Sequence, residues 1–342
     1  MANKCCPSQL RYDVVSKDWV VIAPGRGKRP EEYKRQRMIS NTAPEDCVFC
    51  NLNDEANPLL VIDHGKIVDP KPLTSSWTLA VIPNKFPAFC PDGRAKICKN
   101  KIGPVYHSMD ALGFCEVVIT RNHDKHIALM DFPEVEEIVT AYQERYLALK
   151  DKKFVKYISI FHNHGIEAGA SQAHPHSQII TSPLIDVDLQ NALDNSKKYY
   201  KKNKKCISCE MVDWEMKDKS RLVCENADFI ALCPFAPKTA FEVIITPKEH
   251  LSYFENITAG QRKNLTEILF GAIRKICHGL GDPAYNFYLH TAPADGKDYS
   301  YYHWHWTIMP KTATFAGFEL GSHIEISTIT PESAAEYLRN QN

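Results

Sequence analysis

The spacing of apolar residues along the chain predicts a protein built from short strands and two long helices. Short apolar runs bounded by turn residues indicate strands. In the first half they occur in 11–22 (a hairpin turning at Ser16–Asp18), Trp77–Ile82, Phe114–Thr120 and Tyr157–Phe161. Asp131 and Pro133 signal the start of a helix whose apolar residues recur at helical spacing from Val135 to Tyr146. The segment 88–112 has no clear period and is expected to be a long loop.

The second half of the chain repeats the order of these features. The run F-E-V-I-I-T-P-K-E-H at Phe241–His250 matches C-E-V-V-I-T-R-N-H at Cys115–His123, with one extra residue. A helical pattern from Leu265 to Ile276, a strand at Tyr285–His290 and H-W-H-W-T at His303–Thr307 then follow in register with the first half. We interpret this as an internal duplication, with repeats at 1–182 and 206–342 joined by a linker at 183–205.

The linker is rich in lysine and is expected to form a surface helix. Six lysines lie between Lys197 and Lys205, interleaved with Tyr199 and Tyr200. Such a run could be a nucleic-acid patch, but a solvated helix face is the favoured interpretation. The whole chain carries 41 basic and 41 acidic residues, so no overall field favours nucleic acid or an anionic membrane. The sequence shows neither a signal peptide nor a membrane-spanning run, and a cytoplasmic protein is expected.

Four of the twelve cysteines form two C-x-x-C pairs, one in each repeat. In an intracellular chain such pairs indicate metal or redox sites rather than disulfides. With the histidines that follow in each repeat they supply two sets of four zinc ligands: Cys47, Cys50, His123 and His174, then Cys206, Cys209, His250 and His303. His64 and His126 are rival ligands, and hydrogen-bonded histidines beside buried thiols are the alternative without metal. The other eight cysteines are expected in the core.

The stretch A-G-A-S-Q-A-H-P-H-S-Q at 168–178 is the candidate reaction centre. On a strand, His174, His176 and Gln178 would share one face. If His174 binds metal, His176 is left as a nucleophile towards phosphorus. Gln178, Ser171 and Asn163 then offer hydrogen-bond donors to phosphoryl oxygens.

The second repeat lacks part of this constellation. His305 and Thr307 stand where His176 and Gln178 stand in the first repeat, and bulky residues replace the small ones. We expect one reaction centre, with the second repeat supplying walls. The loop G-R-G-K-R-P offers Arg26 and Arg29 as a phosphate clamp. A solvated basic turn is the alternative for that loop.

With these residues assembled, and above all H-P-H-S-Q at 174–178, the sequence resembles the galactose-1-phosphate uridylyltransferase family of the histidine-triad superfamily. The resemblance runs from about Leu10 to about Arg339. It implies an α+β fold in which two tandem histidine-triad-like repeats form a mainly antiparallel half-barrel sheet with helices outside, usually as a homodimer. It also implies a structural zinc site at Cys47, Cys50, His123 and His174, while zinc at the second set is expected from the repeat.

The resemblance implies a double displacement in which His176 attacks the α-phosphorus of a nucleotide sugar and carries the nucleotidyl group to a second phosphate. Gln178 would hold the transferred phosphate. The expected substrate contacts are Arg26, Arg29, Asn84, Asn163, Ser171, Phe318 and Glu319, the last two within G-F-E-L-G at Gly317–Gly321. The partners are therefore a nucleotide sugar and a sugar 1-phosphate or phosphate, with neither nucleic acid nor membrane.

Three departures bear on the substrate. The second Cys/His set is absent from the best-known uridylyltransferases and is similar to that of relatives that phosphorolyse ADP-glucose. Glu325 stands where uridylyltransferases carry a glutamine, and Lys85 where many have an aspartate. The leading expectation is UDP-glucose with galactose 1-phosphate, in galactose metabolism, and the alternative is ADP-glucose with phosphate. A histidine-triad hydrolase is disfavoured because the neutral amide of Gln178 cannot act as a general acid or base. A non-catalytic binding module is disfavoured by zero net charge and the small residues before His174.

Overall fold

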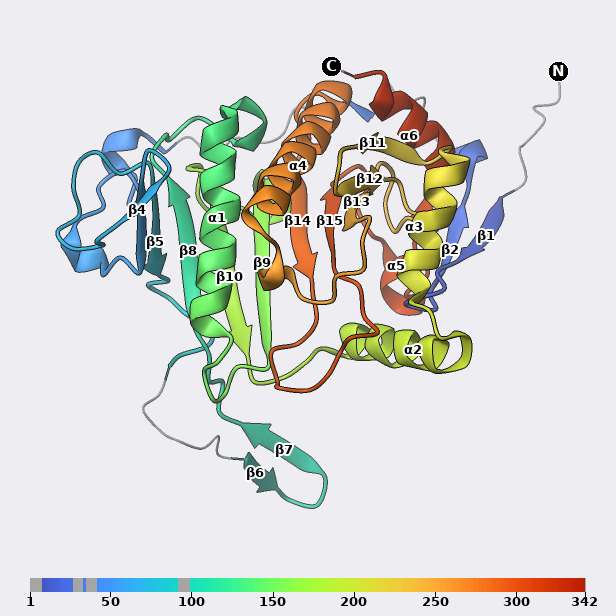
Figure 1. The fold of residues 1–342 in the computed structure, drawn as a ribbon, viewed down its shortest axis with the longest axis horizontal. Helices are drawn as coiled ribbons and strands as arrows, with labels where there is room; N and C mark the ends of the chain where they lie inside the picture. The colour runs from blue at the N-terminus through green and yellow to red at the C-terminus, as the bar shows by residue number, and fades with distance from the viewer. Residues whose placement is uncertain (1–7, 27–32, 35–41, 92–98, 342) are drawn as a thin grey trace.

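One long antiparallel sheet organises the molecule, seen in a computed structural model that describes residues 8–26, 33–34, 42–91 and 99–341 (Figure 1). Within these residues the sheet has eleven strands. Their order across the sheet is β11 (Leu222–Glu225), β12 (Phe229–Leu232), β13 (Val243–Pro247), β15 (His305–Pro310), β14 (Tyr285–His290), β9 (Tyr157–His164), β10 (His176–Ser182), β8 (Cys115–Thr120), β5 (Leu79–Pro83), β3 (Leu60–Asp63) and β4 (Lys66–Val68).

The two halves of the chain meet at the centre of this sheet, where β9 pairs with β14. On one side of that pair follow β10 and β8, and on the other side β15 and β13. The strands next to the central pair, β10 and β15, each begin at the second histidine of an H-x-H motif. The order of strands is therefore the same on both sides. The predicted α+β fold with a large antiparallel sheet is confirmed.

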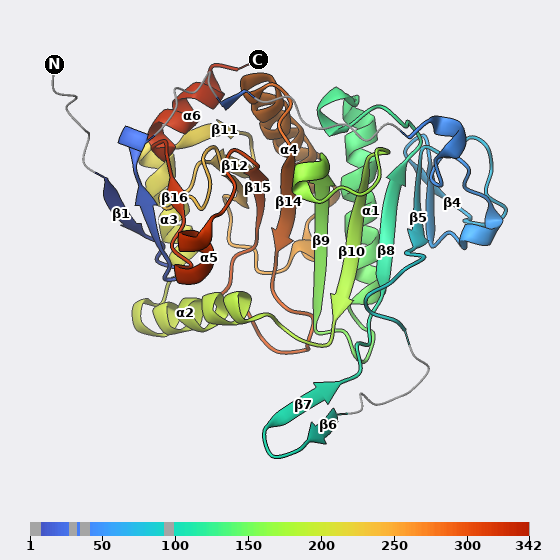
Figure 2. The same ribbon diagram turned by 180° about the vertical axis from the view of Figure 1, so that it is seen from behind.

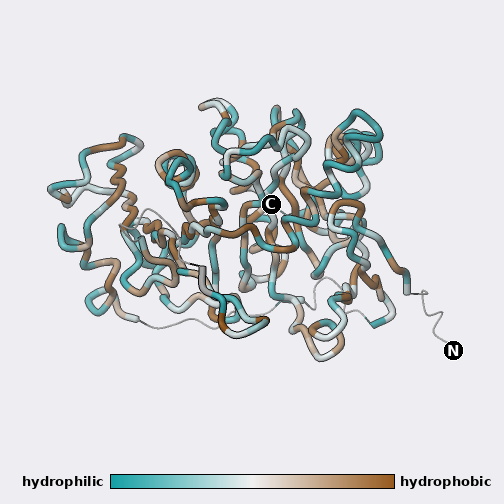
Figure 3. Tube along the Cα trace, turned by 90° about the horizontal axis from the view of Figure 1, so that it is seen from below, coloured by the Kyte–Doolittle hydropathy of each residue, from teal (hydrophilic) through white to brown (hydrophobic). Residues whose placement is uncertain are grey.

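Two helices, α1 (Phe132–Leu149) and α4 (Ala259–Leu280), cover one face of the sheet. They lie in front of it in Figure 1 and behind it in Figure 2. The helical spacing read from the sequence is the buried face of each helix, for example Val139 and Tyr142 in α1 and Ile268 and Ala272 in α4. Figure 3 shows the resulting alternation of apolar and polar stretches along the chain. Burial of these faces stabilises both helices more than intrinsic propensity does.

On the opposite face of the sheet, Phe49, Leu52 and Ala56 pack against a buried cluster that includes Val117 and Ile119 of β8. The second half of this face is covered by helices and a small sheet. It carries α2 (Val187–Asn203), α3 (Ile207–Asp218), α5 (Gly317–Ser322) and a small sheet of β1 (Gln9–Tyr12), β2 (Trp19–Ile22) and β16 (Ile326–Ser327) (Figure 2). Helix α6 (Pro331–Arg339) packs against α4 and β11. The hairpin expected at 11–22 is formed by β1 and β2.

The lysine-rich linker forms α2, as predicted. Asp186 caps its first turn by accepting a hydrogen bond from the Leu189 N–H at 2.9 Å. Leu189 and Leu193 are buried, whereas the lysines between 197 and 205 are exposed. The charge run is therefore the solvated face of an amphipathic helix.

One sequence expectation about the backbone is wrong. The segment 88–112 is not a structureless loop, because β6 (Lys99–Ile102) and β7 (Tyr106–Met109) pair as an antiparallel hairpin that projects from the body in Figures 1 and 2. Ile102 and Tyr106 are exposed, so the hairpin lacks the buried face that produces a detectable alternation of apolar and polar residues. Gly103, with a φ of 63°, lies in the turn. No helix in the described parts of the chain is long and apolar enough to cross a membrane.

Candidate functional site

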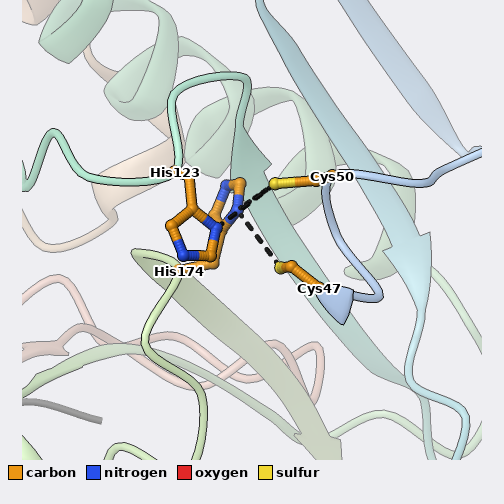
Figure 4. Close-up of side chains that lie close together, drawn as sticks. All are labelled: Cys47, Cys50, His123 and His174. Carbon is orange, nitrogen blue, oxygen red and sulfur yellow. Dashed lines mark hydrogen bonds between the residues drawn. The ribbon is translucent and has the colours of Figure 1, made fainter. Parts of the chain in front are cut away.

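Four side chains from separate parts of the first repeat converge on one point (Figure 4). The Cys50 sulfur lies 3.2 Å from Nδ1 of His123 and 3.4 Å from Nδ1 of His174, and the Cys47 sulfur lies 3.6 Å from the latter. A tetrahedral metal ion with bonds of about 2.0–2.3 Å requires ligand atoms spaced about 3.3–3.8 Å apart. The group is therefore a candidate metal site with the four ligands predicted from the sequence.

Backbone carbonyls fix the orientation of both imidazoles. Nε2 of His174 lies 2.7 Å from the Thr120 carbonyl oxygen, and Nε2 of His123 lies 2.9 Å from that of Thr42. Because a carbonyl only accepts, each Nε2 carries the proton and each Nδ1 presents a lone pair to the cysteines. Burial also lowers the pKa of His174 to about 4, so its imidazole is neutral near pH 7.

The second repeat builds a matching group from Cys206, Cys209, His250 and His303. The Cys209 sulfur lies 3.3 Å from Nδ1 of His250 and 3.5 Å from Nδ1 of His303. Their Nε2 atoms face the carbonyl oxygens of Ser300, at 2.8 Å, and Pro247, at 3.1 Å. The same tautomer therefore recurs, and the rival ligands fall elsewhere. His64 is exposed beside Asp63, and His126 lies next to Asp282.

His176 begins β10 directly beside the first Cys/His group. The strand starts two residues later than the sequence pattern indicated, so His174 lies before the strand, buried, while His176 is half-buried. Nδ1 of His176 lies 2.9 Å from the His174 carbonyl oxygen and therefore donates, leaving the Nε2 lone pair unprotonated. Burial lowers the pKa of His176, and the Phe49 ring packs 5.2 Å from its ring. This is an imidazole prepared to act as a nucleophile.

Alternation along β10 places Gln178 on the same face as His176, the face that α1 and α4 do not cover. Between them, Ser177 points to the helices, where its hydroxyl lies 2.6 Å from that of Tyr142 and 3.0 Å from Nδ1 of His162. This buried network holds the strand in its register beneath His176 and Gln178.

Asn163 on β9 shares this face and is held by a residue from the second repeat. The amide nitrogen of Asn286, on β14, donates to the Asn163 side-chain oxygen at 2.7 Å and to the Ala168 carbonyl at 2.8 Å. The Asn163 amide nitrogen is left to donate elsewhere, and a β-carbon placed on Gly169 would sit 4.0 Å from it. Gly169 has a φ of 86° and therefore lets the loop approach this amide. Sequence reasoning missed Asn286, whose only signal is its place on the open face of a strand.

The remaining predicted residues are spread around this centre. Ser171 is exposed in the loop before β10. Asn84 follows β5 and lies in register with Cys115 of β8. Cys115 in turn pairs with β10 towards the end that is farther from His176, so Asn84 and His176 are about 13 Å apart along the strand direction, at about 3.3 Å per residue. Its side chain accepts from the Phe86 N–H at 2.9 Å.

The structure does not bring the other predicted contacts to His176 within one chain. Arg26 is exposed beside the small sheet, at the end of a short 3-10 turn (Pro24–Arg26). Phe318 and Glu319 lie on α5, over the second half of the sheet, and Glu319 accepts from the N–H of Ala316 at 3.0 Å. Arg29 lies outside the described residues.

The equivalent centre in the second repeat has different chemistry. His305 begins β15 as His176 begins β10, but it pairs with His290, and the two rings stack at 4.8 Å. Burial lowers the pKa of both, to about 4 for His290. A cavity of about 1300 Å³ lies over these strands and reaches Asn163 and Asn286, but the residues lining it do not include His176 or Gln178.

The fold and these two groups define a class of protein. Residues 2–185 match the N-terminal domain and residues 192–342 the C-terminal domain of galactose-1-phosphate uridyl transferase. The chain therefore belongs to the galactose-1-phosphate uridylyltransferase family, of the histidine-triad superfamily, and is a nucleotidyltransferase.

Individual relatives span nearly the whole chain. An ADP-glucose phosphorylase of Arabidopsis thaliana is 32% identical over 97% of this chain and 92% of its own length. A galactose-1-phosphate uridylyltransferase of Thermotoga maritima is 28% identical over 97% of this chain and 98% of its own. The crystal structure of an Arabidopsis thaliana ADP-glucose phosphorylase with bound ADP-glucose superimposes with a TM-score of 0.80 at 28% identity, covering 98% of this chain and all of that one.

Proposed function

We propose that this chain transfers the adenylyl group of ADP-glucose to inorganic phosphate through a covalent intermediate on His176. Nε2 of His176 attacks the α-phosphorus, the bond from that phosphorus to the bridging oxygen breaks, and glucose 1-phosphate leaves. An oxygen of phosphate then attacks the same phosphorus, the phosphorus–nitrogen bond breaks, and ADP leaves. The observation that carries this proposal is the hydrogen bond from His176 Nδ1 to the His174 carbonyl, which keeps the lone pair on Nε2.

Neutral donors around His176 would stabilise the charge on the transferred phosphoryl group. The amides of Gln178 and Asn163 and the hydroxyl of Ser171 are the residues proposed for this role. Gln178 cannot activate water as a general base, which favours transfer to phosphate over hydrolysis. Arg26 and Arg29 are proposed to bind phosphate oxygens. Asn84, Phe318 and Glu319 are proposed as contacts to the rest of the nucleotide sugar.

Two observations favour adenosine and phosphate over the uridine pair. The second Cys/His group is present here, as the resemblance to relatives that phosphorolyse ADP-glucose implies. The Arabidopsis thaliana protein named ADP-glucose phosphorylase is also 32% identical to this chain, against 28% for the Thermotoga maritima uridylyltransferase. Exchange between UDP-glucose and galactose 1-phosphate is the second candidate, favoured by the G-F-E-L-G segment at Gly317–Gly321.

We further propose that each Cys/His group binds zinc, because two thiolates and two imidazoles at tetrahedral spacing are typical of structural zinc. The division into repeats at 1–182 and 206–342 with a linker at 183–205 is part of the same proposal. A homodimer also belongs to this proposal, and in it a second copy of the chain would bring α5 and the loop of Arg26 towards His176.

Intact-protein mass tests the proposal directly. The protein is incubated separately with ADP-glucose and UDP-glucose, with His176→Gly as the control. The expected result is an adenylyl adduct that is absent from the control and is discharged by inorganic phosphate. A uridylyl adduct discharged by galactose 1-phosphate would instead establish the second candidate. No adduct from either donor would refute the covalent mechanism.

A further inference from the structure

A third group of metal-binding side chains lies on the helix-covered side of the sheet, where α4 ends. One donor atom from each of His126, Cys277 and Asp282 lies within 4.8 Å of the others. Nε2 of His126 lies 3.7 Å from Oδ1 of Asp282. His164, the last residue of β9, lies beside this group without belonging to it: its Nε2 lies 2.9 Å from the same oxygen, and its ring is 4.5 Å from that of His126. An imidazole nitrogen, a carboxylate and a thiol therefore converge, with a second imidazole against the carboxylate.

Rigid backbone elements bring these residues together. At the end of α4, Gly281 and Asp282 are consecutive left-handed residues, with φ of 75° and 56°. The N–H groups of both donate to the Cys277 carbonyl, at 2.7 Å for Asp282. This turn folds the carboxylate back beside the thiol of Cys277, and aspartate tolerates the left-handed conformation better than most residues. His164 is fixed by pairing of β9 with β14, which opposes it to Tyr285.

We propose that His126, Cys277 and Asp282 bind a zinc ion that is separate from the two Cys/His sites, and that His164 orients the Asp282 carboxylate. Zinc accepts nitrogen, sulfur and carboxylate ligands at about 2.0–2.3 Å, which spaces the ligand atoms about 3.3–3.8 Å apart. The 3.7 Å separation at His126 meets this spacing. The 2.9 Å hydrogen bond from Nε2 of His164 holds the carboxylate in place beside the other two ligands.

Charge and access also suit a cation. A thiolate and a carboxylate balance the two charges of the ion, so the buried site would be neutral, as a buried ion requires. The side chains of His126 and His164 are only 6% exposed, whereas that of Asp282 is 35% exposed and provides a route of entry. The ion would join the first repeat, through His126, to the last turn of α4 in the second.

The competing explanation is a hydrogen-bonded cluster in which Asp282 accepts from His164 and needs no metal. The two explanations predict different metal contents for the full-length protein. With zinc supplied and excess removed by gel filtration, elemental mass spectrometry should give about three zinc ions per chain if the three groups are filled. The Asp282→Asn and Cys277→Ser proteins should each give about one fewer.

Built-in controls keep this test decisive. The two Cys/His groups retain their zinc only in a folded chain, so about two ions per chain in a variant also reports that it has folded. Cys224→Ser removes a half-buried thiol on β11 that belongs to none of the groups, and should leave the content at about three. A content of about two in the unaltered protein, or of about three in both Asp282→Asn and Cys277→Ser, would overturn the proposal.

If Cys277→Ser does not fold, cobalt substitution supplies the second measurement. Cobalt bound at the third site would add visible absorption to that of the two Cys/His sites. The expected result is a difference spectrum between the unaltered and Asp282→Asn proteins that corresponds to one cobalt ion. Identical spectra would refute a third site. Neither readout depends on catalysis, so the failure of this inference is distinguishable from failure of the proposed function.

Discussion

Replacing Asn286 by leucine should separate the positioning of the reaction centre from the stability of the fold. The change keeps the number and branching of the side-chain heavy atoms but removes an amide that donates to Asn163 at 2.7 Å and to the Ala168 carbonyl at 2.8 Å. Each such bond contributes about 0.5–1.5 kcal/mol, so the variant should lose about 1–3 kcal/mol of unfolding free energy. If the bond to Asn163 is worth about 1.4 kcal/mol in holding that amide towards the transferred phosphate, adduct formation should slow about tenfold.

Gln143→Leu is the matched control for this prediction. Its amide likewise donates two hydrogen bonds, to the carbonyls of Glu255 at 3.0 Å and Ile257 at 2.7 Å, but it lies on α1, on the helix side of the sheet. Urea unfolding should show a similar stability loss in both variants, and rapid-quench measurement of the nucleotidyl adduct should show slowing only in Asn286→Leu. Equal adduct rates in the two variants would refute the claim that Asn286 positions a phosphate donor.

Three further outcomes are expected. Cys50→Ser should lower zinc content by one ion and, at zinc concentrations 100 times the Kd, lower the free energy of unfolding by about 2.7 kcal/mol. Adduct formation should also slow, because the neighbouring Phe49 packs on His176, and a normal adduct rate would contradict this expectation. Cys206→Ser should also lose one zinc ion yet remain folded and active, so loss of the adduct in a folded protein would show that the second site serves catalysis. Burial raises the pKa of Glu242 to about 7, above its unfolded value of about 4.3, so the native state holds a proton that the unfolded chain has lost between these values. Stability should therefore fall as the pH rises from about 4 to 7, by on the order of 3 kcal/mol, and urea titrations should find this dependence abolished in Glu242→Gln.

The sequence predicted the metal groups well because their chemistry restricts the residue types. Structural zinc sites are built mainly from thiolates and imidazoles, and the recurrence of these residues in register identified which histidines belonged to each set. The buried strands could also be recognised, since β8 and β14 are rich in apolar and aromatic residues. The hairpin of β6 and β7 was missed because its apolar residues Ile102 and Tyr106 are exposed and leave no pattern of burial in the sequence.

The parts of the centre that depend on contacts between distant segments could not be read from the sequence. Asn286 and Asn163 are brought together by the register between β9 and β14, which is set by sheet topology rather than by any local motif. The cluster around Asp282 likewise depends on how α4 ends against β9. Its members are unremarkable in sequence, and His126 was interpreted as a rival ligand for the first zinc.

The pairing of β9 with β14 has a consequence for the separate halves of the chain. If either half were made alone, its strand of this pair (β9 in the first half, β14 in the second) would become an edge with a row of unpaired N–H and C=O groups beside a buried apolar core. Each half would then be an aggregation hazard, and the only partner that satisfies its edge is the other half. A cut in the exposed, lysine-rich end of α2 should therefore yield two fragments that stay associated, whereas neither fragment should be soluble by itself. Although the proposed nucleophile lies in the first half, that half cannot dispense with the second.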